Sequence, residues 1–165
     1  MRKLLAALAA VTMALAIFGC QGEETALRPS EEALLYFVDA EMMRLIPSKL
    51  EVSAADGSEA ARIVLRALVE GHDDNPQIRR IMPKMPEEVS VYVSGEIAYV
   101  DLGADFVAAH PPGRNAELLT VYQIVNSLSS LEEVVNVRFT IDGKTQRDFL
   151  GFIDMRETFV PDYYV

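Results

Sequence analysis

Carboxylates are the side chains of this 165-residue sequence that could most readily do chemistry. Three adjacent pairs stand out: Glu31–Glu32, Glu87–Glu88 and Glu132–Glu133. A glycosidase needs two acids that face each other across a cleft and whose pKa values are pushed apart. Adjacent acids in so acidic a sequence are more typical of solvated surfaces, so these pairs do not by themselves predict an active site.

Five aspartates lie where loops follow predicted strands or helices. Asp101 and Asp105 flank a Leu-Gly step after a strand, a place where active sites often lie, but a turn or helix N-cap role is the interpretation that we favour. The Asp73–Asp74 pair follows His72 and could hold a cation, although a solvated acidic loop is the simpler reading. Asp142 precedes a glycine and predicts a turn.

Other reactive residue types are scarce. One cysteine, Cys20, excludes an intramolecular disulfide and a thiolate zinc site, and two histidines, His72 and His110, leave little for a His-rich metal site. The sequence lacks a Gly-x-Ser-x-Gly nucleophile motif and the glycine-rich motifs that cradle phosphates. We therefore expect no catalytic residue, no metal, no cofactor and no enzymatic activity.

Composition indicates one globular domain with an acidic surface. Half of the residues are hydrophobic, and the formal net charge is -10. Without Arg2 and Lys3, the two charged residues of positions 1–19, the charge becomes −12. Because Lys and Arg must neutralise phosphates, we expect no nucleic-acid partner. An acidic chain also gains nothing from anionic lipid head groups, so any membrane attachment needs another device.

The N-terminus supplies such a device. Arg2 and Lys3 precede a 15-residue apolar stretch, Leu4–Phe18, which as a helix reaches about 22 Å and falls short of a bilayer core of about 30 Å. A secretory signal fits better than a transmembrane helix. The segment Ile17–Cys20 resembles a bacterial lipobox, with an aliphatic residue at −3 and a small one at −1.

We therefore predict a lipoprotein signal peptide over residues 1–19, a lipidated Cys20 and a polar tether over residues 20–30. A diacylglyceryl group has two acyl chains, enough for stable anchoring. The protein is then extracytoplasmic and held on a bacterial membrane by lipid. An uncleaved anchor and ordinary secretion are the alternatives.

Hydrophobic periodicity predicts the folded elements. A capping pair, Asp56 and Glu59, begins a helix that Gly71 ends. The other expected elements are a buried strand at 34–38, a hairpin over 89–102, a helix over 115–131 and a strand over 135–141. The stretch 41–52 is a loop or a small edge strand, 149–153 is a short strand, and the tail 161–165 is loose. The connection 72–88 is long enough to be functional or to cover a sheet edge.

This order of strand, helix, strand, strand, helix, strand predicts an α+β fold. It is the βαββαβ sandwich, in which two helices pack on one face of a mixed or antiparallel sheet. The core stripe of the second helix is expected to comprise Leu118, Val121, Tyr122, Val125 and Leu128.

Collinear motifs resemble a known family. They are Leu35–Asp39 with Leu45 and Pro47, Leu65–Gly71, Ile81–Pro83, Ala98–Leu102, Glu117, Val121–Leu128 and Val135–Gly143. Together they resemble the GerMN domain of the GerM family of sporulation and germination lipoproteins over roughly residues 34–155, and we assign the domain to residues 31–160. The namesake carries two such domains, and this chain has room for one.

The resemblance implies a small α/β module similar to the ring-building motifs of sporulation channel proteins. Such modules are interaction or assembly domains without known catalytic residues. We therefore expect a lipid-anchored, non-catalytic scaffold with an envelope protein as partner and weak or membrane-dependent self-association. The alternatives are an envelope ligand-binding module that uses a cleft under the 72–88 connection, and a hydrolase or a regulator of a cell-wall hydrolase.

Overall fold

The computed structural model describes residues 29–71 and 74–165. In chain order its elements are β1 (Glu31–Val38), β2 (Leu45–Val52), α2 (Gly57–Glu70), η2 (Pro86–Glu88), β3 (Val89–Ser94), β4 (Ile97–Leu102), α3 (Ala104–Ala109), α4 (Arg114–Leu128) and β5 (Asn136–Ile141). The predicted signal peptide 1–19, Cys20 and most of the tether 20–30 lie outside the described residues, as do His72 and Asp73. None of the described helices is long and apolar enough to cross a membrane.

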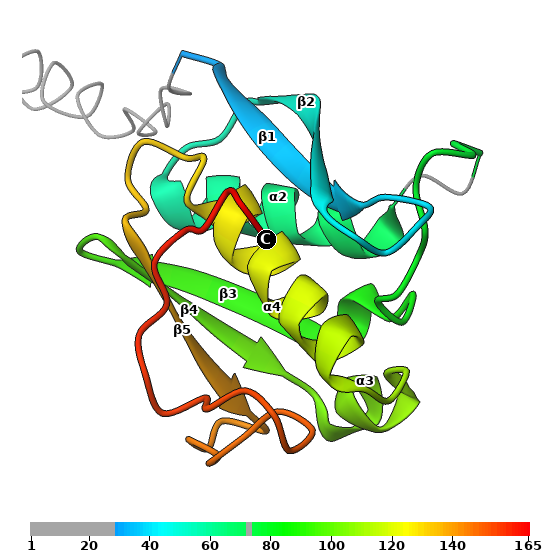
Figure 1. Ribbon diagram of the computed structural model, residues 1–165. Coiled ribbons are helices and arrows are strands. Elements are labelled where there is room, and N and C mark those ends of the chain that lie inside the picture. The colour runs from blue at the N-terminus through cyan, green and yellow to red at the C-terminus, as the bar shows by residue number, and fades with distance from the viewer. Residues whose placement is uncertain (1–28, 72–73) are drawn as a thin grey trace, which may run out of the picture.

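Helices α2 and α4 lie between two sheets (Figure 1). On one side β1 pairs antiparallel with β2, and on the other β4 lies between antiparallel β3 and parallel β5. The predicted α+β sandwich is confirmed, but α2 and α4 lie between two sheets instead of on one face of a single sheet. The strands divide into a hairpin layer and a three-stranded layer, because the free edge of β1 meets a helix instead of another strand.

Helix α2 follows the sequence expectation closely. The Asp56 side chain accepts from the Glu59 amide over 2.8 Å, and the Glu59 carboxylate accepts from the Ala55 amide over 2.7 Å, one residue before the partner expected in a capping box. Gly71 ends the helix with φ 64°, a left-handed conformation in which glycine is favoured. The start and stop signals in the sequence were therefore sufficient here.

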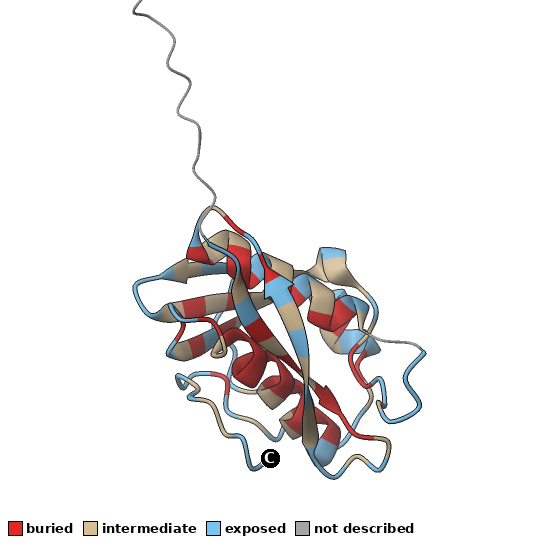
Figure 2. Ribbon diagram, turned by 90° about the horizontal axis from the view of Figure 1, so that it is seen from above, coloured by how far each residue is buried: buried red, intermediate tan, exposed pale blue. Residues whose placement is uncertain are grey.

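Helix α4 is buried on almost all sides. Val121, Val125 and Leu128 are buried as predicted, but Leu118 and Tyr122 are only half-buried. In their place, five polar residues of this helix are buried: Glu117, Thr120, Gln123, Asn126 and Ser127. A helix between two layers is buried on more than one side, so one apolar stripe cannot describe it; buried residues are red in Figure 2.

Polar side chains of α4 and the turn after it seal the free edge of β1. Ser127 Oγ accepts from the Tyr36 amide over 2.8 Å, and Ser130 Oγ accepts from the Leu34 amide over 2.9 Å. Gln123 Nε2 donates to the Tyr36 carbonyl over 3.2 Å. These contacts replace a neighbouring strand, which explains the burial of Ser127 and Gln123 and the separate hairpin layer.

The stretch 41–52, ambiguous in the sequence, contains the full-length edge strand β2. Leu45 donates its amide to the Val165 carbonyl, so alternate residues Leu45, Pro47 and Lys49 turn their backbone groups toward the outer edge. Pro47 has no amide to donate, and a lysine on an edge discourages pairing with another chain. A proline is therefore compatible with a strand at this position.

The connection after α2 covers one end of β1. Ile78 forms an antiparallel bridge with Asp39, and the Arg79 amide donates to the Val38 carbonyl over 2.9 Å. These contacts support the expectation that part of this connection covers a sheet edge.

The C-terminal tail, expected to be loose, is held in place. Phe159 and Val137 exchange both backbone hydrogen bonds at the outer edge of β5, over 2.8 and 2.9 Å. The Asn126 side chain donates to the Asp162 carbonyl and accepts from the Asp162 amide. The expectation of a strand at 149–153 was also wrong: this segment is irregular, with an isolated bridge between Asp148 and Asp154.

Candidate functional site

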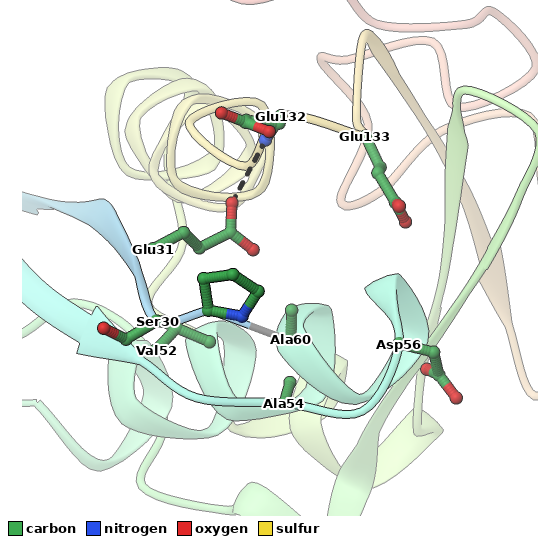
Figure 3. A pocket seen from close by; sticks show the side chains of 9 residues that line it. Ser30, Glu31, Val52, Ala54, Asp56, Ala60, Glu132 and Glu133 are labelled. Atoms are coloured by element: carbon green, nitrogen blue, oxygen red, sulfur yellow. Dashed lines mark hydrogen bonds between the residues drawn. The ribbon is translucent and has the colours of Figure 1, made fainter. Parts of the chain in front are cut away.

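Two of the three acid pairs meet at one pocket. Glu31 at the start of β1 lies beside Glu132 and Glu133, which follow α4, around a cavity of about 350 Å³ (Figure 3). The amide of Glu132 donates to Glu31 Oε2 over 3.4 Å. Glu32 points elsewhere, to Lys49 Nζ at 2.9 Å. The fold thus brings together carboxylates that lie 101 residues apart in the sequence.

One of these acids, Glu133, lies at the beginning of helix α2. A Cβ atom at Gly57, the first helical residue, would collide with Glu133 Oε2, so the carboxylate lies directly against the helix start. Asp56 points away from the cavity in Figure 3 and caps the Glu59 amide. Negative charge at a helix N-terminus is stabilising. Within residues 29–71 and 74–165, no group of three or more His, Cys, Asp or Glu side chains is arranged to hold a metal ion.

His110 lies in the interior of the fold. Its Nε2 shares a hydrogen bond with Thr120 Oγ1 over 2.8 Å, and its ring meets Phe149 edge-on at 5.0 Å. Burial lowers the pKa of His110, and the charge of Glu117 opposes that shift only in part. The imidazole is therefore a neutral core group and does not face the acid pairs.

The buried His110 makes stability depend on pH. Below the ordinary pKa near 6.5, the unfolded chain binds a proton that the folded chain rejects, so stability falls as the pH drops through the window below that value. Urea titrations at about pH 7.5 and pH 5.5 measure this loss. We expect His110→Gln to lose less stability than the wild type over the same interval. Equal losses in both proteins would contradict this role for His110.

Asp101 and Asp105 do not come together. Asp101 Oδ1 accepts from Thr140 Oγ1 over 2.6 Å and from the Gly143 amide over 2.7 Å, whereas Asp105 is exposed on α3. Asp101 therefore lies within strand β4 and holds the distant turn after β5, which differs from the local turn or N-cap considered for it. Asp142 forms the predicted turn with φ 49°, and its Oδ1 accepts from the Ala104 amide at the start of α3.

The outer face of the β3–β4–β5 sheet carries a second depression, of about 400 Å³. Tyr92, Tyr99 and Arg138 occupy one row across the three strands, because Tyr92 pairs with Tyr99 and Tyr99 pairs with Arg138. The two tyrosine rings stack, with centroids 4.9 Å apart and planes 8° apart. The alternation of the strands indicated which side chains point outward, but not that this face would be hollowed.

Under residues 78–82 of the 72–88 connection, the expected cleft is small. The space between residues 78–82 and helix α2 measures about 10 Å³, room for about one water molecule. Gln123 and Phe37 close its other side. Residues 78–82 therefore pack against the core, and a larger depression of about 200 Å³ lies where Pro86 of the same connection meets helix α2 and β3.

The sequence matches the family described as "Germane: Sporulation and spore germination" over residues 34–147. No curated protein matches it. A solved structure of a candidate lipoprotein from Clostridium perfringens is similar, with a TM-score of 0.56 and 16% identity over 79% of this chain and 87% of that one.

Two structures of the sporulation protein GerM from Bacillus subtilis are also similar. The tandem GerMN domains align with a TM-score of 0.57 and 16% identity, over 77% of this chain and 44% of the tandem. The first GerMN domain alone aligns with a TM-score of 0.54 and 14% identity, over 76% of this chain and 92% of that domain. The folded part of this chain therefore has the fold of one such domain.

Proposed function

Since this chain belongs to the Germane family of sporulation and spore germination domains, we propose that it is a lipid-anchored, non-catalytic interaction module of a bacterial envelope. Its task is to bind another envelope protein during sporulation or germination. The observation that carries the proposal is the extent of the family match, which runs from β1 to just beyond the turn after β5. The shared feature is thus nearly the whole domain and not one local motif.

The polar groups of the interior support a non-catalytic role. The carboxylate oxygens of Glu117 accept from the amides of Phe152 and Ile153, and His110 shares its hydrogen bond with Thr120. Each of these buried groups is thus engaged in holding parts of the fold together. A general acid or base would instead need to face a substrate.

The lipid anchor rests on the N-terminal sequence. Cys20 follows an apolar stretch at the position where a lipoprotein signal is cut, and the similar C. perfringens structure is itself a candidate lipoprotein. Two acyl chains on Cys20 would hold the domain at a membrane surface that its acidic residues cannot bind.

We expect radiolabelled palmitate to enter the wild-type protein in growing cells and to be absent from Cys20→Ser. The thiol is the acceptor of the diacylglyceryl group, and serine offers no sulfur for that bond. Gel autoradiography of the immunoprecipitated proteins measures the label, and a Ser53→Ala variant provides the control. Equal labelling of the wild type and Cys20→Ser would refute the anchor.

The negative charge of the chain favours binding to a different protein over binding to a second copy of this chain. Without the leader the chain carries −12, so two copies repel each other, although weakly at physiological salt where the Debye length is about 8 Å. A partner with a basic surface would instead be steered toward it. Anchoring to one membrane raises the local concentration, so weak self-association remains part of the proposal.

A further inference from the structure

The outer face of the β3–β4–β5 sheet has a groove to which the proposed function assigns no role. One row across the sheet is Tyr92, Tyr99 and Arg138, and the next is Ser90, Asp101 and Thr140. Their side chains share one face because residues two apart in a strand point the same way. Together with Gly143 and Thr145 of the following turn, they line the depression of about 400 Å³.

The wall of this groove is fixed in position. Gly143 belongs to the turn after β5, and its amide donates to Asp101 Oδ1 over 2.7 Å. The hydroxyl of Thr140 donates to the same oxygen over 2.6 Å. Asp142 and Gly143 both have positive φ, 49° and 69°, which is the backbone of a tight turn. The groove therefore exists before any ligand arrives, so binding costs little reorganisation.

The lining is rich in hydroxyl groups and close to electrically neutral. It contains one cation, Arg138, and one anion, Asp101, in a chain whose formal charge is -10. Both hydrogen bonds given above for Asp101 end on Oδ1, which leaves Oδ2 as an acceptor for a ligand hydroxyl. In the stacked pair of tyrosines, Tyr92 is accessible to a ligand, since this residue is 57% exposed.

We propose that this groove binds a glycan strand, with an amino-sugar polymer of the cell wall as the class of ligand. A pyranose ring presents a flat face of C–H groups that packs on tyrosine rings, and its hydroxyls donate to Asp101 and accept from Arg138. The volume lies in the range of about 300–1,000 Å³ that is typical of ligand pockets. A polyanion fits less well, because one arginine would have to offset the charge of the whole chain.

This site would give the protein a second attachment in the envelope, and it goes beyond the proposed protein partner. The inference depends on the proposed function only for the extracytoplasmic location, where cell-wall glycan is found. Binding of a sugar to the purified full chain does not depend on that location. Failure of one proposal therefore leaves the other to be judged separately.

The test is calorimetric titration of the full chain in detergent with a pentamer of N-acetylglucosamine, together with co-sedimentation with purified peptidoglycan sacculi. We expect the wild type to bind both, and Tyr92→Ala and Arg138→Ala each to weaken pentamer binding at least about tenfold. Tyr164→Ala is the matched control, because this tyrosine is fully exposed and lies outside the groove. It should stay within about twofold of the wild type. The urea midpoint of each variant checks its folding.

Several outcomes would overturn the proposal. If the wild type binds neither the pentamer nor sacculi, the groove is not a glycan site. If Tyr164→Ala weakens binding as much as Tyr92→Ala, binding lies elsewhere. If Tyr92→Ala abolishes crosslinking to an envelope protein and leaves glycan binding unchanged, the face belongs to a protein partner.

Discussion

Replacing Leu128 with Ala should lower the free energy of unfolding by about 2–5 kcal/mol. Leu128 ends helix α4 and is fully buried in the main core between the two sheets. Truncation removes apolar contacts and leaves a cavity that rigid neighbours on both sides cannot fill. Urea unfolding at equilibrium measures the change from the shift of the midpoint.

Leu118→Ala provides the comparison on the same helix. Leu118 was expected in the same stripe, but it is only half-buried, so its truncation should cost about 1 kcal/mol or less. Equal losses for the two variants would show that the single stripe predicted from the sequence was right after all. A cost below about 0.5 kcal/mol for Leu128→Ala would place that residue on the surface.

Replacing Glu117 with Ala should destabilise the fold by about 3 kcal/mol. This fully buried carboxylate accepts from the Ile153 amide over 2.6 Å and from the Phe152 amide over 3.2 Å. Hydrogen bonds to a charged group are worth about 1.5–3 kcal/mol each, and water can replace only part of them. The segment they hold places Phe149 and Met155 in the core, so its release would also expose apolar surface.

Glu117→Gln separates hydrogen bonding from charge. The amide oxygen of Gln can still accept from the segment, so we expect a loss of about 1 kcal/mol. Amide exchange at Ile153 should accelerate strongly in Glu117→Ala and only modestly in Glu117→Gln. Unchanged exchange in Glu117→Ala would contradict the anchoring role, whatever the effect on global stability.

Local signals in the sequence were sufficient to predict the helices and strands whose formation depends on neighbouring residues. The capping residues Asp56 and Glu59 and the terminal Gly71 marked helix α2, and strict alternation marked the hairpin of β3 and β4. The family resemblance also predicted the α+β fold, which the structure and the comparisons confirm. These features need only neighbouring residues or a pattern spread evenly along the chain.

The wrong predictions, for helix α4 and for the C-terminal tail, come from contacts between residues that are far apart in the sequence. Ser127 and Gln123 are buried because they bind the backbone of Tyr36, 91 and 87 residues away. The tail is ordered because Asn126 holds Asp162 by two hydrogen bonds. Periodicity within a helix cannot reveal a second sheet on its far side, so the apolar stripe predicted from it did not include these polar residues.

The candidate sites likewise divide into residues that the sequence singled out and residues whose importance only the fold shows. The sequence singled out the acid pairs, and the fold placed Glu31, Glu132 and Glu133 around one cavity at the start of α2. It gave no reason to select Tyr92 or Arg138, because their significance arises from the register of three strands. Tyrosines at outward positions of two paired strands are the signal that could have found this groove.

The proposed interaction module is tested most directly by crosslinking in intact cells that produce the full chain during sporulation or germination. Mass spectrometry of the captured products identifies what lies against the domain, and Cys20→Ser serves as the control that should lose the contact. We predict that the wild type captures a different extracytoplasmic protein, with at most a minor yield of its own copies. Capture of this chain alone, or the same products from Cys20→Ser, would contradict the account.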